Sequence, residues 1–494
     1  MTDARQTYSF GPLERRGIFG AVRGGQVAVL ATGALTAILI LDRAPSAGGA
    51  FLAMIVCALA GAAAFAPLGG RTLQEWAPVA MWFAGRRMRR RHRFRSPVTE
   101  AGVVARGGGE LSPAPPVAPE SLRDVRIVSV DHRERAIGAL SERSGRRLTA
   151  VLACRVAAFS LLDQEAQERR LARWGLVLSG SGGTAIRRLQ WIERTAPAQG
   201  DELARWVHSE RDPAVPLRGT AMIESYLELI SSSTRVTQEH EVLLAVQVDG
   251  RRVRERGRDA IARALVEQTE RVAQGLEAAD VTVLGALSPG QLARALRTAF
   301  DPFARAELAT LEAADRDRDG LSEVNAWPLG AREAWDHFRS DGAVHATYWI
   351  GAWPRINVSP MFMDALLGHS TAVRSVAVTF EPLATDRSTR EIEAAVTRDR
   401  ADRELRVRFG QSETARQRQA ADATMRREAE LAAGHGEVRL SGFVTVSGRD
   451  PEDLQRACGE VLEHAARARL ELHRLYGQQA EAFAFTLPLC RGLR

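Results

Sequence analysis

The hydrophobic pattern of the chain starts with two apolar runs near its N-terminus. Residues 24–41 and 44–70 contain no charged side chain. Because a helix rises about 1.5 Å per residue, roughly 17 to 25 apolar residues are needed to cross a hydrocarbon core of about 30 Å. The pattern therefore predicts a transmembrane helical hairpin, with helices at about 25–41 and 48–68.

Arginine indicates how this hairpin is oriented. The loop between the two runs holds a single arginine, Arg43, whereas several arginines precede the first run and follow the second. By the positive-inside rule, we expect both termini and the large domain to be cytoplasmic, at the plasma membrane of a bacterium. A signal peptide is the alternative, but it should end at a cleavage site and not continue into a second apolar run.

A cluster of arginines follows the hairpin closely. Trp76 and Trp82 stand just before it, in the order expected of an interfacial aromatic belt followed by contacts to anionic lipid headgroups. We therefore expect the cluster to bind membrane lipid or to set topology, and binding of nucleic acid through its phosphates is the less favoured alternative. The juxtamembrane cluster consists of Arg86, Arg87, Arg89, Arg90, Arg91, Arg93 and Arg95.

The remaining chain divides into modules. Residues 97–121 are rich in proline and glycine, which predicts a linker. Strand and helix patterns alternate after it, so we expect two α+β cytoplasmic subdomains at 122–335 and 336–494. With residues 1–96 as hairpin and juxtamembrane segment, the predicted fold class is α+β. It comprises a transmembrane helical hairpin followed by split β-α-β layers, in which antiparallel sheets carry helices on one face.

Two kinds of helix stand out in this pattern. Ser288-Pro289 has the favoured order of an N-cap followed by a first-turn proline. In contrast, residues from about 387 to 433 are rich in Arg, Glu, Ala and Gln and poor in apolar side chains. We expect one long polar helix there, which is either a projecting or coiled-coil arm or a solvated helix without a partner.

Composition restricts the chemistry that the chain performs. All 67 basic residues are arginine, which indicates a GC-rich bacterial genome and excludes any step that needs a lysine. The cysteines, at Cys57, Cys154, Cys458 and Cys490, have neither metal-binding nor disulfide spacing. The formal net charge of +7 owes much to the juxtamembrane arginines, so the total says little about a basic ligand surface elsewhere.

Two motifs resemble ligand-binding loops but lack essential parts. Residues 315–320 match the start of an EF-hand loop, but its twelfth position is Ala326 instead of glutamate. Residues 179–184 are glycine-rich like a phosphate-binding loop, but a Walker A loop needs a lysine. The histidines lack zinc-ligand spacing, and there is no Gly-x-Ser-x-Gly elbow. We therefore expect no catalytic residues, no cofactor, no metal and no enzyme activity.

Tryptophan is concentrated in the middle of the chain. Tryptophan is favoured both in protein cores and at the hot spots of interfaces. Core packing is the default for these residues, and a partner interface is the alternative. The candidates for such an interface are Trp327, Trp335, Trp349 and Trp353.

Several segments carry a family resemblance. They are Arg187–Arg194, Tyr226–Thr234, Asn325–Pro328, Trp349–Pro354 and Phe485–Pro488. With the hairpin and its basic exit, they resemble a family of actinobacterial membrane proteins of unknown molecular role. Members of that family accompany conjugation and type IV secretion-like ATPases. More weakly, the middle of the chain is similar to the non-catalytic N-terminal domain of the conjugative traffic ATPase.

The resemblance implies a partner that supplies energy. In some systems the traffic ATPase is fused to a small subunit made of a transmembrane hairpin. This sequence ends at Arg494 without a P-loop module, so we expect the ATPase to be a separate chain.

Three hypotheses for the function follow. The first is a structural inner-membrane component of a type IV secretion-like or conjugative transfer apparatus. It would dock the separate P-loop traffic ATPase, other secretion subunits or copies of itself. The second is a core membrane component of type VII secretion, since such components also begin with a short hairpin followed by a cytoplasmic domain. The third is a membrane-attached nucleic-acid-binding protein.

Overall fold

The structure is a computed structural model, in which the chain forms two compact units. The sheet unit comprises residues 93–392 and 426–494, and the helical unit comprises residues 11–92 and 393–425. The acidic loop considered at 315–320 lies outside the described residues, as does the motif at Tyr226–Thr234. The structure describes residues 24–68, 71–97, 103–105, 111–113, 117–133, 135–156, 159–197, 225, 238–304, 326–354, 358–368, 370–408, 415–432 and 436–493.

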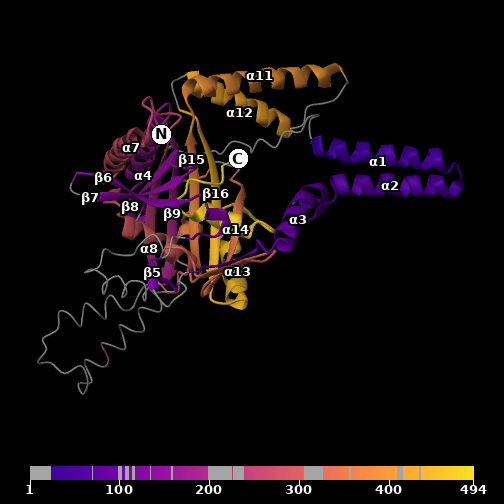
Figure 1. The fold of residues 1–494 in the computed structure, drawn as a ribbon. Helices are drawn as coiled ribbons and strands as arrows, with labels where there is room; N and C mark the ends of the chain where they lie inside the picture. The colour runs from indigo at the N-terminus through magenta and orange to yellow at the C-terminus, as the bar shows by residue number, and fades with distance from the viewer. Residues whose placement is uncertain are drawn as a thin grey trace, which may run out of the picture. The chain divides into compact units, whose positions relative to one another are not determined.

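The helical unit contains the two apolar helices that the sequence predicts. α1 spans Gly24–Arg43 and α2 spans Ala47–Phe65, and the two lie side by side (Figure 1). Only 17% of each apolar window is buried, and Leu35 and Phe51 are each 61% exposed. A core helix of a soluble protein hides its apolar side chains, whereas a membrane helix presents them to lipid. Both helices are therefore long and apolar enough to cross a membrane.

Small residues and one buried amide hold the hairpin together. Gly33 lies against Ala60, where a larger side chain would collide. This allows the close approach of backbones that is typical of membrane helices. Gln26 is 8% exposed and donates from Nε2 to the carbonyl oxygen of Ala64 at 3.0 Å, so its amide is not left unpaired in an apolar surrounding. Ser46 caps α2 by accepting from the backbone N–H of Gly49 at 3.2 Å.

The predicted long polar helix differs in the structure. Two helices occupy this part of the chain, α11 (Thr385–Arg408) and α12 (Ala415–Ala432), which are separate elements in Figure 1. Gly410 stands between them in the sequence, and glycine is the weakest helix former after proline. The helical unit also contains α3 (Leu73–Met88), in which the Glu75 carboxylate accepts from the backbone N–H of Thr72.

Within the described residues, the sheet unit is built on one large 13-stranded antiparallel sheet, so the predicted α+β class and antiparallel pairing are confirmed. A separate two-stranded ribbon pairs β4 (Val103–Ala105) with β5 (Leu111–Pro113). In spatial order the main path is β3 (Arg93–Arg95), β12 (Gly330–Glu333), β13 (Phe338–Ser340), β14 (Ala343–Ala352), β16 (Val438–Gly448), β15 (Val373–Pro382), β9 (Ile186–Pro197), β10 (Gln238–Asp249), β8 (Arg147–Arg155), β7 (Arg135–Glu142) and β6 (Arg126–His132), with β11 (Thr282–Ala286) beside β8 and β17 (Glu471–Arg474) beside β14.

The sheet contains two copies of one β-α-β-β-α-β unit. Repeat A runs β8, α4, β9, β10, α7, β11, and its strands lie in the order β11-β8-β10-β9. Repeat B runs β14, α10, β15, β16, α13, β17, and its strands lie in the order β17-β14-β16-β15. Each helix thus connects two strands that have a third strand between them. The helices are α4 (Gln164–Gly180), α7 (Arg258–Ala278), α10 (Asp364–Leu367) and α13 (Pro451–Arg467).

The two repeats join edge to edge. β9 pairs with β15 antiparallel, with Ile192 opposite Ala377, and a rotation about this point exchanges the repeats. The sheet is therefore continuous, and the boundary expected at residue 335 falls in the short connection between β12 and β13. The physical reason is that an unpaired edge strand exposes a row of N–H and C=O groups, which pairing with a second edge satisfies.

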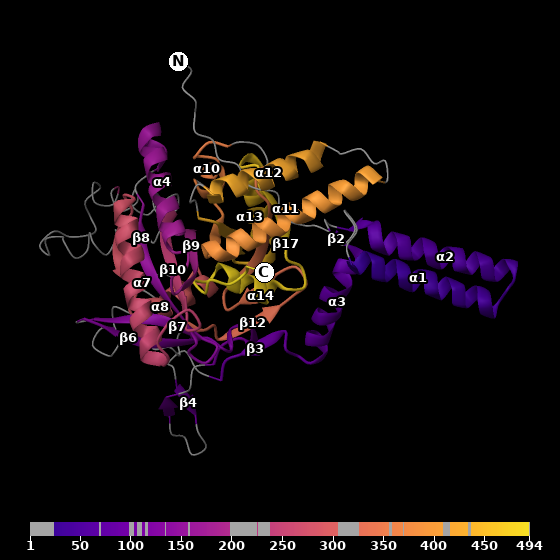
Figure 2. The ribbon, with the colours of Figure 1, turned by 90° about the horizontal axis from the view of Figure 1, so that it is seen from above.

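Both faces of the sheet are covered. On one face, α4 and α7 pack on repeat A, while α10 and α13 pack on repeat B; Figure 2 shows α4 beside α7. The other face is covered by α8 (Pro289–Phe300), α14 (Gln479–Phe483) and the segment 484–493. The expectation of helices on one face is thus incomplete, because strands such as β10 are buried on both faces and need two covering layers.

Each repeat is followed by a segment that reaches the other repeat. α8 follows repeat A and begins with the predicted Ser288 cap; at its end, the Phe300 carbonyl lies 3.0 Å from His345 Nε2 in repeat B. The segment 484–493 follows repeat B, and its Leu489 carbonyl accepts from Gln247 Nε2 of repeat A at 3.1 Å. Gln247 in β10 and His345 in β14 lie on corresponding strand pairs of the two repeats. The crossing segments therefore bind equivalent places.

The rotation that exchanges the repeats also relates a second pair of hydrogen bonds. Arg194 on β9 donates from Nη1 to the Ala295 carbonyl of α8 at 2.7 Å. Thr379 occupies the equivalent position on β15 and donates to the Arg491 carbonyl at 3.2 Å. A buried carbonyl without a partner costs about 1–3 kcal/mol, so these side chains stabilise the crossing segments on the sheet.

Candidate functional site

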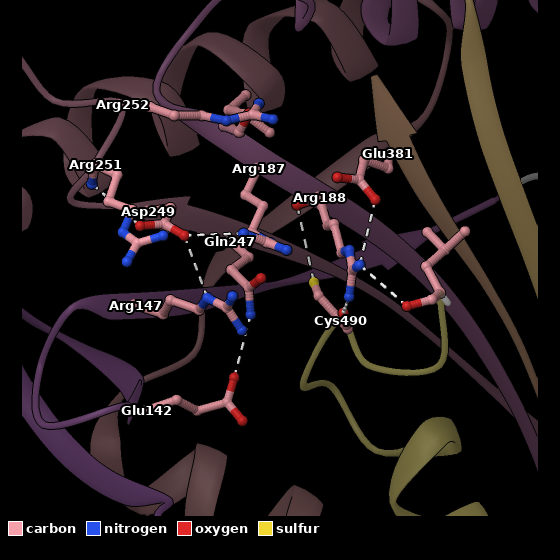
Figure 3. Close-up of polar contacts among 12 residues, drawn as sticks. Glu142, Arg147, Arg187, Arg188, Gln247, Asp249, Arg251, Arg252, Glu381 and Cys490 are labelled. Carbon is pink, nitrogen blue, oxygen red and sulfur yellow. Dashed lines mark hydrogen bonds and ion pairs between the residues drawn. The ribbon is translucent and has the colours of Figure 1, made fainter. Parts of the chain in front are cut away.

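One buried carboxylate organises several arginines at the end of β10. Asp249 is 2% exposed, and its Oδ2 accepts hydrogen bonds from Arg147 Nε at 3.3 Å and Arg187 Nη1 at 3.0 Å. Its Oδ1 accepts from the backbone N–H of Arg251 at 3.1 Å. These residues meet because β8 and β9 both begin beside the end of β10, their common neighbour in the sheet (Figure 3).

The charges in this cluster are not balanced. Burial disfavours the ionised form of Asp249, but the Arg251 N–H and the Arg147 and Arg187 guanidiniums outweigh it and hold the pKa of Asp249 below its usual value. Burial lowers the pKa of Arg147, and so do the neighbouring Arg187 and Arg143, although Asp249 opposes them. One carboxylate therefore neutralises only part of the surrounding positive charge.

Two residues of β9 hold the segment 484–493 on the sheet. Arg188 donates from Nη1 to the Cys490 carbonyl at 3.1 Å and from Nη2 to Glu381 at 3.2 Å. Gln190 donates from Nε2 to the Phe485 carbonyl and accepts from the Cys490 N–H, each at 2.7 Å. Because this segment is neither helix nor strand after residue 486, side chains supply the hydrogen bonds that its buried backbone needs.

Arg491 extends the same anchorage to the start of the sheet unit. It donates from Nε to Glu142 at 2.7 Å, from Nη1 to the Ser121 carbonyl at 2.7 Å and from Nη2 to Asp124 at 2.8 Å. Burial opposes its charge, but Glu142 and Asp124 raise the pKa of Arg491 above its usual value. Ala118, near the end of the predicted linker 97–121, is buried in the core, and the bounds of the linker stay a prediction.

A rim of exposed arginines lies outside the buried cluster. The loop between β10 and α7, residues 250–257, has the sequence Gly-Arg-Arg-Val-Arg-Glu-Arg-Gly, and Arg258 begins α7. The Gly250 N–H donates to the Arg146 carbonyl at 2.9 Å, and the Arg258 guanidinium lies next to Gly145, so the loop contacts the β7–β8 turn. We define the arginine rim as the exposed residues Arg143, Arg251, Arg254, Arg256 and Arg258.

Arg252 turns inward between the rim and the buried cluster. It donates from Nη1 to the Ile186 carbonyl at 2.6 Å. Burial lowers its pKa and Glu381 opposes that effect, whereas Arg187 and Arg387 add to it. The arrangement therefore offers guanidinium donors to an anion.

The buried His345 lies between two serines, and hydrogen bonding inside the core explains this arrangement. His345 is fully buried, with Nδ1 at 2.8 Å from Ser447 Oγ and Nε2 at 2.9 Å from Ser340 Oγ. Since Nε2 also lies 3.0 Å from the Phe300 carbonyl, which only accepts, Nε2 carries the proton. Burial lowers the pKa of His345 to about 4, although the bond to Phe300 opposes this, so the ring is neutral at pH 7.

Across the part of the chain that is described, no three His, Cys, Asp or Glu side chains lie together as metal ligands. The glycine-rich segment 179–184 forms the end of α4 and the turn that follows it. There, Ser181 donates to the Val177 carbonyl at 2.7 Å, and Gly183 has a φ of +74°. Its backbone conformation is explained by helix termination.

The predicted juxtamembrane cluster is divided among three elements. Two of its arginines lie in the last turn of α3, three in the following turn and two on β3, which pairs with β12. The guanidinium carbon of Arg86 lies 4.3 Å from the centre of the exposed Trp82 ring, which is a cation–π contact. Lipid binding by the cluster stays a prediction. In chain order the three groups are Arg86 and Arg87, then Arg89, Arg90 and Arg91, then Arg93 and Arg95.

The four tryptophans do not share one environment. Trp327 is 3% exposed in the core, as the default interpretation predicts. Trp349 and Trp353 are partly buried and pack against the apolar clusters of repeat B. Trp335 is 36% exposed and stacks on Tyr476, with ring centres 6.4 Å apart. A partner interface at these residues stays a prediction, and Trp335 is the most exposed of the four candidates.

The Asp249 cluster and the arginine rim were not among the sites expected from the sequence. A signal was present, since residues 251–258 contain five arginines and one glutamate. The arginines at 143–147 and 187–188 are distant along the chain, and only strand pairing brings them to the same end of the sheet.

Comparison with protein families connects this region to secretion. Residues 236–350 match the model of the EccE family, described as a putative type VII ESX secretion system translocon. The match runs from β10 to β14, so it includes Asp249 and the loop 250–257, but it covers less than half of the chain. No curated protein matches the chain. With the two apolar helices, the match supports a secretion-system membrane family and does not support the conjugative, type IV resemblance.

Proposed function

We propose that this chain is a membrane component of a type VII secretion translocon. The observation that carries the proposal is the match of residues 236–350 to the EccE family. The outward-facing apolar side chains of α1 and α2 support its anchoring in a bilayer. This is the second of the three hypotheses drawn from the sequence, and the comparisons favour it over the first.

The proposed role is structural. The hairpin anchors the chain, and the sheet unit presents a surface to other subunits of the machine, including a separate P-loop ATPase that supplies the energy. The reciprocal crossing segments support this role, because they tie the two repeats into one unit through buried hydrogen bonds. In this proposal the chain itself catalyses no reaction.

Copurification from cells that express the whole gene cluster tests the proposal. The tagged full-length chain is extracted in mild detergent, and its partners are identified by mass spectrometry. We expect other secretion subunits and a P-loop ATPase, in excess over an unrelated tagged membrane protein with two helices. Recovery of the chain alone would contradict the proposal.

We further propose that the sheet unit is cytoplasmic, following the positive-inside rule. Arg43→Cys introduces a thiol at the end of α1, and Arg467→Cys introduces one on the exposed surface of α13. In intact cells, a membrane-impermeant maleimide should label the first variant and not the second. After lysis it should label both. Labelling of Arg467→Cys in intact cells would reverse the orientation.

A further inference from the structure

The loop 250–257 is longer than the fold requires. In repeat A, eight residues connect β10, which ends at Asp249, to α7, which begins at Arg258. In repeat B the equivalent connection between β16 and α13 consists of Arg449 and Asp450, and Asp450 caps the helix by accepting from two backbone N–H groups. Two residues therefore suffice to close this crossover, whereas repeat A uses eight, of which four are arginine.

The additional charge acts against folding. Like charges that are held together destabilise the compact state. Burial and the neighbouring Arg187 and Arg387 lower the pKa of the loop residue Arg252, and the one acid in the loop, Glu255, pairs with Arg263 at 2.7 Å. Asp249 is already shared by two guanidiniums. A loop that is longer than the equivalent connection of repeat B and rich in like charge is expected to serve binding, as exposed loops commonly do.

From the contrast between the two connections, we propose that the arginine rim binds a carboxylate-rich segment of a partner protein. The rim residues adjoin the ends of three neighbouring strands, β7, β8 and β10. At about 4.8 Å per strand, these ends extend over about 10 Å, which suits a few acidic side chains in succession. Guanidinium groups bind carboxylates through paired N–H donors, and the recessed Asp249 fixes the arginines beneath the rim.

Two other anionic partners fit the surface less well. Single-stranded nucleic acid is bound by a basic track with aromatic side chains on which bases stack. A bilayer is bound by basic residues together with exposed apolar ones that insert. The segments 142–147 and 249–258 contain no aromatic residue, and the large apolar side chain of the loop, Val253, packs against the core. Charge without stacking or insertion favours an acidic peptide.

Fluorescence anisotropy with a labelled decaglutamate peptide tests this inference on the full-length chain in neutral detergent. The variant R251Q/R254Q/R256Q removes three rim charges. The control variant R332Q/R339Q/R467Q removes three exposed arginines elsewhere in the sheet unit. We expect the rim variant to bind the peptide at least about tenfold more weakly, with a change below about twofold in the control. Unchanged circular dichroism and melting temperature verify that both variants fold.

Three results would overturn the inference. They are equal weakening in both variants, absence of peptide binding by the wild-type chain, and rim-dependent binding of single-stranded DNA or anionic vesicles that exceeds binding of the peptide. The inference does not rest on the identity of the secretion machine. Rim-dependent peptide binding by a chain that copurifies with no secretion subunit would support this inference and contradict the proposed function.

Discussion

The two repeats have the same topology but use their equivalent positions differently. In repeat A, Thr149 of β8 lies opposite Gln247 of β10. In repeat B, His345 of β14 lies opposite Ser447 of β16, and both pairs hold a segment that arrives from the other repeat. At the strand ends, however, repeat A carries the arginine rim and repeat B a two-residue connection. The comparison separates what the fold needs, which both repeats share, from what one repeat has acquired.

The largest expected loss of stability comes from weakening the anchorage of the segment 484–493. Gln190→Leu keeps the volume of the side chain but leaves the Phe485 carbonyl and the Cys490 N–H unpaired in the core. We expect a loss of about 3 kcal/mol in the free energy of unfolding, measured by urea titration in detergent. Ser375→Ala, at the equivalent and only half-buried position of repeat B, is the control and should cost less than about 1 kcal/mol.

The second prediction concerns the buried charge of repeat A. Asp249→Asn leaves Arg147 and Arg187 without their shared carboxylate, and we expect a loss of about 2 kcal/mol at pH 7. Because the folded pKa of Asp249 is depressed, its stabilisation is present above the unfolded value of about 3.9 and is lost as pH falls through the folded pKa. The difference between variant and wild type should therefore shrink in acid. A difference that stays constant down to pH 2 would contradict this electrostatic origin.

The third prediction uses the histidine of repeat B. The folded pKa of His345 is about 4 and its unfolded value is about 6.5, so only the unfolded chain binds a proton between these pH values. Its contribution to stability should fall by about 1.4 kcal/mol per pH unit between pH 6.5 and 4. His345→Gln should remove this part of the slope, as measured by urea titration at several pH values. Thr149→Val, at the equivalent position of repeat A, should shift stability without changing the slope.

The smallest expected effect is at the rim. Arg254→Gln together with Arg256→Gln should change the free energy of unfolding by no more than about 0.5 kcal/mol, because both side chains are exposed. The shift in melting temperature measures this change. A loss above about 2 kcal/mol would show that repeat A needs its long loop for folding, and the contrast with repeat B would then lose its functional meaning.

Much of the architecture was accessible from the sequence pattern. The uncharged runs predicted α1 and α2 because a bilayer requires about twenty consecutive apolar residues. The Ser288-Pro289 start of α8 was an equally local signal. The polar stretch at 387–433 showed the limit of such signals, since composition predicted helix but not the division into α11 and α12.

The candidate site could not be predicted in the same way. The arginines of the buried cluster come from β8, β9 and the end of β10, segments that are separated by tens of residues. Their proximity depends on strand register, which is fixed by pairing across the whole sheet. Along the sequence, the juxtamembrane arginines account for much of the net charge, and only the folded chain reveals a second concentration of arginine around Asp249.

The sequence by itself determined the apolar hairpin, the α+β class and the start of α8, because these depend on local periodicity and charge. The tertiary structure decided which strands are neighbours, that β9 and β15 fuse two repeats into one sheet, and that each repeat is secured by a segment following the other. Those features arise because edge strands and buried carbonyls must find hydrogen-bond partners, wherever in the chain those partners lie.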